Sequence, residues 1–150
     1  MLTTCRQRNQ MLSRESWLVV YYGLFAGILV TGALNMLHMR GAFFTNHAAD
    51  IVVPAWLYVA SRGLHSAFGR TTRLQRSIGR TPEIAALSLF AASAITEVSQ
   101  LYWPHGPFPG RFDPLDLVAF ASGLTVCYAL DKNGERAAAR ATLGASRSAA

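Results

Sequence analysis

The stretch WLVVYYGLFAGILVTGALNML, from Trp17 to Leu37, contains no charged side chain. A helix rises about 1.5 Å per residue, so this stretch reaches roughly 30 Å, which is the hydrocarbon thickness of a bilayer. Three further apolar stretches follow it, at Asp50–Ser61, Ile84–Tyr102 and Leu115–Leu130. The sequence therefore predicts an all-α fold, an integral membrane bundle of four transmembrane helices.

The composition agrees with this class of protein. Hydrophobic residues make up 51% of the chain and charged residues 15%, whereas a soluble domain carries about 25% charged residues. The alternatives are a soluble all-α bundle and a signal peptide at the first stretch. Buried soluble helices seldom run for about twenty residues without charge, and the first stretch lacks an A-x-A-like cleavage site. We expect it to stay as a membrane anchor.

The net charge of +6 is explained by topology. Basic residues gather before the first stretch, between the second and third, and after the fourth. They are Arg6, Arg8 and Arg14; Arg62, Arg70, Arg73, Arg76 and Arg80; and Lys132, Arg136, Arg140 and Arg147. The positive-inside rule then predicts that both termini and the middle connection are cytoplasmic. No nucleic-acid recognition motif accompanies these residues, so we expect no nucleic-acid partner.

Three segments are expected along the chain. Residues 1–16 form a basic cytoplasmic N-terminus, residues 17–130 form the four-helix transmembrane domain, and residues 131–150 form a cytoplasmic tail. The tail is rich in Ala and Arg and has little apolar pattern, so it is expected to be disordered. Within the middle connection, the arginines from Arg73 to Arg80 fit either a short interfacial helix or a solvated loop.

The predicted spans differ in quality. The third and fourth have clear helix starts, because Pro82 and Pro114 each follow a residue that can cap a helix. Small residues along the third span predict that it packs centrally in the bundle. The second span is the least certain, since Asp50 opens it and Pro54 interrupts it, and it must draw on flanking residues to cross.

Four acidic residues in or beside the predicted spans fall on the extracytoplasmic side. Asp50 opens the second span, Glu97 lies about two turns before the end of the third, and Asp113 and Asp116 open the fourth. Gln100 shares a helical stripe with Glu97. A carboxylate at that depth is costly to desolvate, so Glu97 is expected to face the bundle or a polar cleft.

The region from Glu97 onward resembles the signature of the VanZ-like family of small bacterial integral membrane proteins. That signature has the pattern E-x-x-Q, a loop that ends in an Arg and two Asp, and a last helix with a Gly. The matching residues here are Glu97, Gln100, Arg111, Asp113, Asp116 and Gly123. The chain departs from the pattern at Phe120, where many members have Asn, and upstream, where His47 and Asp50 are alternative equivalents of a polar position.

The resemblance implies a multi-pass protein of the bacterial plasma membrane, part of the cell envelope. The family takes its name from a gene associated with low-level resistance to the glycopeptide teicoplanin, and it implies no established biochemical activity. The candidate ligand-binding residues are Asp50, Glu97, Gln100, Arg111, Asp113 and Asp116.

Three classes of function remain open. The first is an extracytoplasmic site that binds or processes an amphiphilic envelope molecule, such as a lipid-linked precursor or a glycopeptide. The second is a structural or accessory subunit of a membrane complex, in which pairs such as Arg111 with Asp113 hold helices together and the partners are membrane lipids and another membrane protein. The third is an ion pathway through Glu97, which the apolar inner halves of the spans disfavour.

Catalysis is left open, because Glu97 and Asp116 suit general acid and base roles but no nucleophile is evident. We expect no cofactor and no metal site. The histidines are scattered along the connections, and Cys5 and Cys127 form no metal-binding motif.

Overall fold

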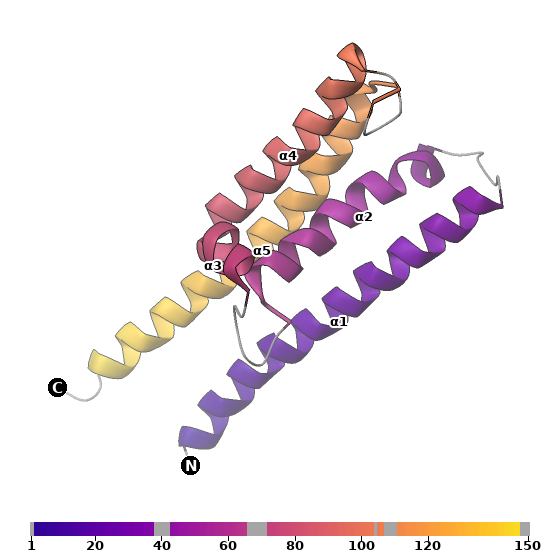
Figure 1. Cartoon of the computed structure of the whole chain (residues 1–150). Helices are drawn as coiled ribbons and strands as arrows, with labels where there is room; N and C mark the ends of the chain where they lie inside the picture. The colour runs from indigo at the N-terminus through magenta and orange to yellow at the C-terminus, as the bar shows by residue number, and fades with distance from the viewer. Residues whose placement is uncertain (1, 38–42, 66–71, 104, 107–110, 148–150) are drawn as a thin grey trace.

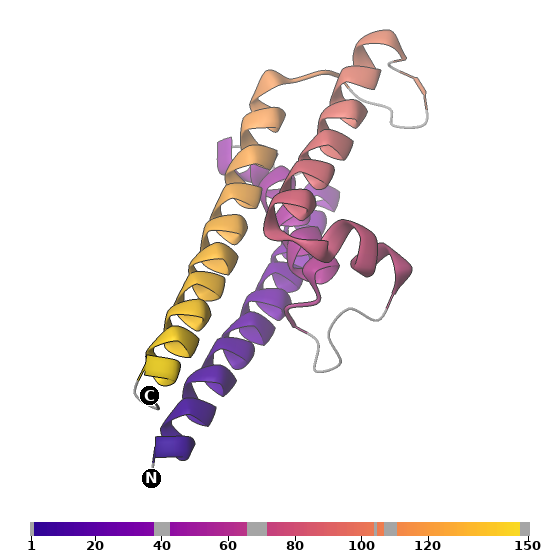
Figure 2. The same ribbon diagram turned by 90° about the vertical axis from the view of Figure 1, so that its left-hand side faces the viewer.

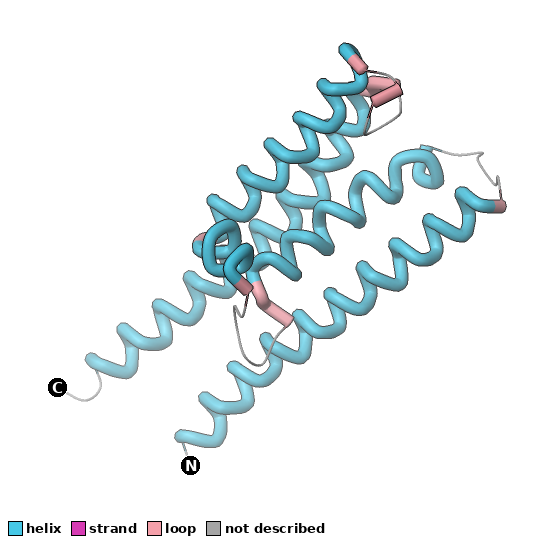
Figure 3. The backbone as a smooth tube through the Cα atoms, viewed as in Figure 1, coloured by secondary structure: helices cyan, strands magenta, loops and turns pink. Residues whose placement is uncertain are grey.

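A computed structural model describes residues 2–37, 43–65, 72–103, 105–106 and 111–147. Within these ranges the chain is helical and contains no strand (Figures 1 and 3). The elements are α1 (Leu2–Met36), α2 (Phe43–Arg62), α3 (Arg73–Ser77), the 3-10 turn η1 (Ile78–Arg80), α4 (Pro82–Tyr102) and α5 (Pro114–Arg147). The predicted all-α class is confirmed.

Within the described ranges, three helices are long and apolar enough to cross a membrane. The qualifying segments are Glu15–Met36, Pro82–Tyr102 and Pro114–Arg140. Three such segments are consistent with a multi-pass membrane protein. The second predicted span, in α2, is not among them.

The four long helices alternate in direction (Figures 1 and 2). α1 and α4 run one way along the bundle, and α2 and α5 run back. The start of α1 and the end of α5 consequently lie at the same end, which we call the terminal end. The opposite end, where α2 and α5 begin, is called the distal end.

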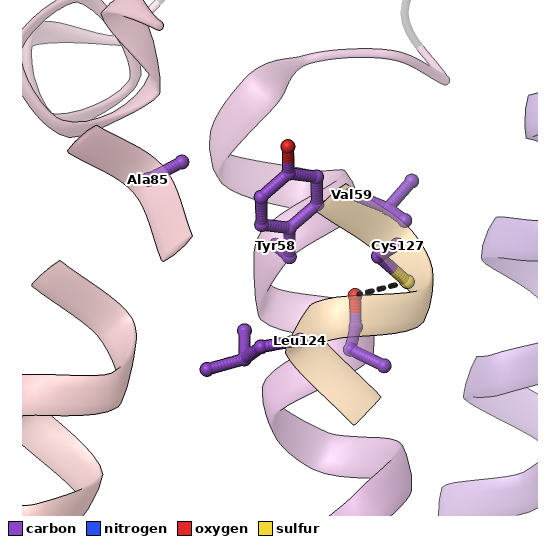
Figure 4. Packing of buried hydrophobic residues seen from close by; sticks show 6 residues of the cluster. Tyr58, Val59, Ala85, Leu124 and Cys127 are labelled. Atoms are coloured by element: carbon purple, nitrogen blue, oxygen red, sulfur yellow. Dashed lines mark hydrogen bonds between the residues drawn. The ribbon is translucent and has the colours of Figure 1, made fainter. Parts of the chain in front are cut away.

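α2 is the central helix of the bundle. It packs against α1, α4 and α5, and it supplies the fully buried side chains Tyr58 and Val59. Ala85 of α4 and Leu124 and Cys127 of α5 complete this core, as Figure 4 shows. The prediction that the third span is central was wrong: only 11% of the candidate span in α4 is buried. Small side chains permit close packing but do not require it, and much of α4 faces outward.

A glycine sets the distance between α2 and α5. A Cβ atom on Gly123 would lie 2.2 Å from the carbonyl oxygen of Ile51, a separation that no side chain tolerates. The missing side chain lets the two backbones meet directly. As a result, the second turn of α2 lies beside the first turn of α5 at the distal end.

The predicted starts of α4 and α5 are confirmed. The Thr81 hydroxyl oxygen accepts a hydrogen bond of 3.2 Å from the backbone N–H of Ile84, and Pro82 follows at the first helical position. At the other start, an Asp113 carboxylate oxygen accepts a bond of 2.9 Å from the backbone N–H of Leu115. Each cap satisfies an otherwise unpaired N–H of a first turn.

Ion pairs join the helices near the terminal end, and one of them is buried. The Arg62 guanidinium lies 2.6 Å from the Asp131 carboxylate, and both side chains are at most 7% exposed. The Tyr58 hydroxyl donates to the same carboxylate at 2.8 Å, and Arg62 also pairs with Glu135 at 2.9 Å. Arg62 therefore joins α2 to α5.

The structure differs from the expectation of a disordered tail after residue 130. α5 continues as one helix to Arg147. The turn that follows the apolar stretch is bound to the bundle, since Lys132 pairs with Glu83 of α4 at 2.5 Å and Asp131 pairs with Arg62 of α2. A helix that is fixed at this point propagates readily through an Ala-rich sequence.

Candidate functional site

Ionisable side chains from three helices converge at the distal end. α2 contributes His47 and Asp50, α4 contributes Glu97, and the start of α5 contributes Asp113 and Asp116. We call these five residues the distal cluster. Because they belong to the early part of α2, the late part of α4 and the start of α5, they lie at the distal end, opposite the start of α1 and the end of α5 (Figure 1).

Specific contacts link the members of the distal cluster. His47 Nδ1 lies 2.7 Å from Asp116 Oδ1, which joins α2 to α5. The backbone N–H of Asp113 donates to Glu97 Oε2 at 3.5 Å, which joins α5 to α4. Asp50 is close enough to Asp116, His47 and Glu97 to interact with each of them electrostatically.

Local helix geometry explains why these side chains meet. His47 and Asp50 are three residues apart on α2, so they share one face, and the same spacing relates Asp113 and Asp116. The close approach at Gly123 brings these two faces together. The cluster therefore depends on backbone packing more than on contacts among its own members.

The cluster is partly sealed from its surroundings. Glu97 is 6% exposed, and the side chains of His47 and Asp116 are 12% and 19% exposed. The burial of Glu97 agrees with the expectation that it faces the bundle. Its one described hydrogen bond is long, so most of the hydrogen-bonding capacity of this carboxylate is unused within the described residues.

Two of the sequence candidates lie outside these contacts. Arg111 is exposed, and Gln100 is partly buried. Among the residues that the structure describes, neither one forms a hydrogen bond or ion pair with the cluster. The pairing of Arg111 with Asp113 or Asp116, on which the structural hypothesis relied, is not formed there; His47 contacts Asp116 instead.

His47 is the residue that the sequence analysis did not select. His47 and Asp50 were alternative equivalents of one polar position in the VanZ-like pattern. The structure brings both of them to the site. The available signal was their spacing, because residues three apart on a helix share a face. The spacing alone did not show that His47 is largely buried or that its partner lies on α5.

Three members of the cluster form a candidate metal centre. His47, Asp113 and Asp116 each offer one ligand atom, and these atoms lie within 4.8 Å of one another. Imidazole nitrogen and carboxylate oxygen are ligands for zinc and other divalent metals. The expectation of no metal site rested on the scatter of the histidines along the connections, whereas helix packing brings His47 beside the carboxylates of Asp113 and Asp116.

The charge of the distal cluster defines what it can bind. Asp50, Glu97, Asp113 and Asp116 are acceptors when ionised, and His47 supplies at most one positive charge. Carboxylates that share a site repel one another, so the cluster favours a cation or a ligand rich in N–H and O–H donors. A bare anionic group would be repelled.

A separate apolar groove of about 540 Å³ runs along the distal part of α4. Its lining residues are Ala94, Ile95, Val98, Ser99, Tyr102 and Trp103. Ile95, Val98, Ser99 and Tyr102 lie on faces of α4 that point away from Glu97, and Ala94 borders the face of Glu97. The groove and the distal cluster are therefore different features of the same end of the bundle.

Comparison with protein families, curated proteins and solved structures found no match for this chain. The resemblance to the VanZ-like family rests on the motif residues and stays a prediction.

Proposed function

We propose that this chain is a VanZ-like protein with four transmembrane helices, whose distal cluster binds an amphiphilic molecule of the cell envelope at the extracytoplasmic face. The observation that carries the proposal is the convergence of His47, Asp50, Glu97, Asp113 and Asp116 from three helices. Assembling like charges at one place opposes folding, so a cluster of this kind is better explained by a ligand than by packing.

The arrangement of the helices supports the topology in this proposal. α2 has 20 residues, which span roughly 30 Å as a helix. Because it lies at the centre of the bundle, protein covers much of its surface, and it needs less apolar character than a helix that faces lipid. Four crossings also agree with the alternating helix directions and with the arginines near the terminal end, which the positive-inside rule assigns to the cytoplasm.

The chemistry of the cluster narrows the class of ligand. Of the two ligands that the sequence suggests, a phosphate-bearing lipid-linked precursor would meet repulsion from the carboxylates. A glycopeptide carries ammonium, amide and hydroxyl donors, which suit them. We therefore favour a donor-rich head group at the cluster, with the apolar part of the molecule in the surrounding lipid.

The alternative function is that of a structural or accessory subunit of a membrane complex. The contacts His47–Asp116 and Asp113–Glu97 favour it, because they connect α2, α5 and α4 without any ligand. In that case the cluster holds helices together, and its loss should lower stability.

The two functions are separated by Glu97→Gln. This change keeps the shape of the side chain and removes its charge. We expect the purified variant to unfold at the same temperature in detergent and to lose binding of teicoplanin, measured by the shift in unfolding temperature on adding it. The corresponding cellular readout is growth of a bacterial host in the presence of teicoplanin.

The matched control is Glu15→Gln, the same change at an exposed site on α1. It should leave both readouts unchanged. The site hypothesis would be eliminated by a stable Glu97→Gln protein whose unfolding temperature still changes on adding teicoplanin and which still protects cells. A destabilised Glu97→Gln protein would favour the structural function.

A further inference from the structure

We propose that the α3–η1 segment carries a binding surface for anionic phospholipids, formed by Arg73, Arg76 and Arg80. The ligand chemistry is the phosphate of a lipid head group at the membrane surface of the terminal end. This surface is independent of the distal cluster, so neither proposal depends on the other.

The segment is fixed to the bundle rather than free in a loop. The Gln75 side-chain amide donates to the carbonyl oxygen of Ala60 at 2.9 Å, and Arg62 Nη1 donates to the carbonyl oxygen of Gly79 at 2.8 Å. Gly79 lies so close to α2 that a Cβ atom there would be 2.0 Å from the carbonyl oxygen of Ser61. The position of the segment is therefore set by the end of α2.

The side chains of the three arginines are exposed beside this attachment. Arg73, Arg76 and Arg80 are exposed, whereas Gly79 is buried. Spacings of three and four residues keep successive basic side chains on neighbouring parts of one surface. The fixed side of the segment thus faces α2, and the basic side faces outward.

The orientation and depth of α3 match a membrane surface. α3 is seen end-on in Figure 1 and from the side in Figure 2, so it crosses the direction of the long helices. A helix across a membrane-spanning bundle lies along the plane of the membrane. η1 ends at Arg80, and the candidate span in α4 begins at Pro82, which puts the arginines at the level of the head groups.

The charge of the segment favours anionic over zwitterionic lipid. No Asp or Glu occurs between Gly63 and Pro82. The acids that pack nearby already have partners, since Glu83 pairs with Lys132 and Asp131 pairs with Arg62. A basic surface at this level attracts lipid phosphates, and the guanidinium group suits them because it can donate two parallel hydrogen bonds.

The test uses the full-length protein in detergent micelles that contain either phosphatidylglycerol or phosphatidylcholine, with bound lipid counted by native mass spectrometry. The wild-type protein should retain phosphatidylglycerol preferentially. Each basic residue near an anionic surface changes affinity about five-fold. The triple variant Arg73→Gln, Arg76→Gln and Arg80→Gln should thus bind this lipid on the order of a hundred-fold more weakly.

The control removes the same charge farther along α5, with Arg136→Gln, Arg140→Gln and Arg147→Gln. It should keep the preference, because these residues lie beyond the turn at Asp131 that joins the bundle. A triple α3–η1 variant that keeps the preference, or a control that loses it equally, would overturn the proposal.

Two further measurements cover other outcomes. If the triple variant fails to fold, Arg73→Gln alone should still weaken binding about five-fold, and unchanged binding by this variant would overturn the proposal. Inorganic phosphate in excess should not displace the lipid. Displacement would identify a site for small anions in place of a lipid surface.

Discussion

Gly123 of α5 lies against the backbone carbonyl of Ile51 in α2, and a Cβ atom on Gly123 would sit 2.2 Å from that oxygen. This contact between two helix backbones holds α5 beside the second turn of α2. His47 and Asp50 occupy that turn, and Asp116 occupies the facing turn of α5. A residue that carries no side chain thus determines whether the distal cluster assembles.

The first prediction is that Gly123→Ala separates α2 from α5. Overpacking of this kind costs about 1–3 kcal/mol of unfolding free energy and sometimes more. Thermal unfolding in detergent measures the loss. The control is Gly32→Ala, because an added Cβ there would meet no atom within 4 Å. Equal losses for the two variants would contradict the role given to Gly123.

A second prediction concerns the buried pair of Arg62 and Asp131. Arg62→Gln or Asp131→Asn leaves the other charge without its main partner, which should cost about 3–5 kcal/mol of unfolding free energy. The double variant should lose less than the sum of the two single losses, because both changes remove one interaction. The control is Arg136→Gln, at an exposed site on α5, and it should change stability little. Strict additivity would show that the pair is not coupled.

The third prediction uses the repulsion within the distal cluster. Asp50 lies within electrostatic range of Asp116 and Glu97, which repel its charge, and of His47. Asp50→Asn removes like-charge repulsion, so we expect it to raise unfolding free energy by roughly 0.5–2 kcal/mol while weakening ligand binding. The same Asp→Asn change at Asp131 should lower stability. A destabilised Asp50→Asn protein would mean that this carboxylate holds the helices together.

The fourth prediction is the topology. Reporter tags at residue 1, in the Arg70–Arg80 connection and at residue 150 should all report the cytoplasm, and a tag near Gly106 should report the exterior. The arginines near the terminal end and the alternating helix directions give this expectation. An external C-terminus would exclude the four-span arrangement, and with it the extracytoplasmic position of the distal cluster.

Local signals in the sequence predicted the helix starts well. Thr81 and Asp113 form the expected caps, and Pro82 and Pro114 follow them. These signals act over three or four residues, so they can be read without knowledge of the fold. The all-helical class was predictable for a similar reason, because the apolar stretches are long and continuous.

The order of the helices in the bundle was not predictable in the same way. Asp50 and Pro54 made the second stretch look like the weakest span, yet α2 lies at the centre and α4 at the edge. Polar residues lower the hydropathy of a helix. They do so both in a helix that is surrounded by protein within the membrane and in one that lies outside the membrane. The sequence pattern alone cannot separate these two causes.

The candidate site was predictable in part. The carboxylates of Asp50, Glu97, Asp113 and Asp116 were expected at one face of the membrane, and they lie at one end of the bundle. The partners within the site were not predictable, because His47 reaches Asp116 only through packing between α2 and α5. Arg111 was expected to pair with Asp113 or Asp116, but it lies exposed in the connection before α5.

The buried thiol of Cys127 allows the rate at which α5 separates from α2 to be measured. Cys127 is 4% exposed, and its Sγ lies 3.8 Å from the carbonyl oxygen of Ala55 (Figure 4). A thiol-reactive dye can reach it only after α5 separates from α2. In a Cys5→Ser chain, the rate of labelling therefore reports how often the bundle opens at its centre, and no probe has to be introduced.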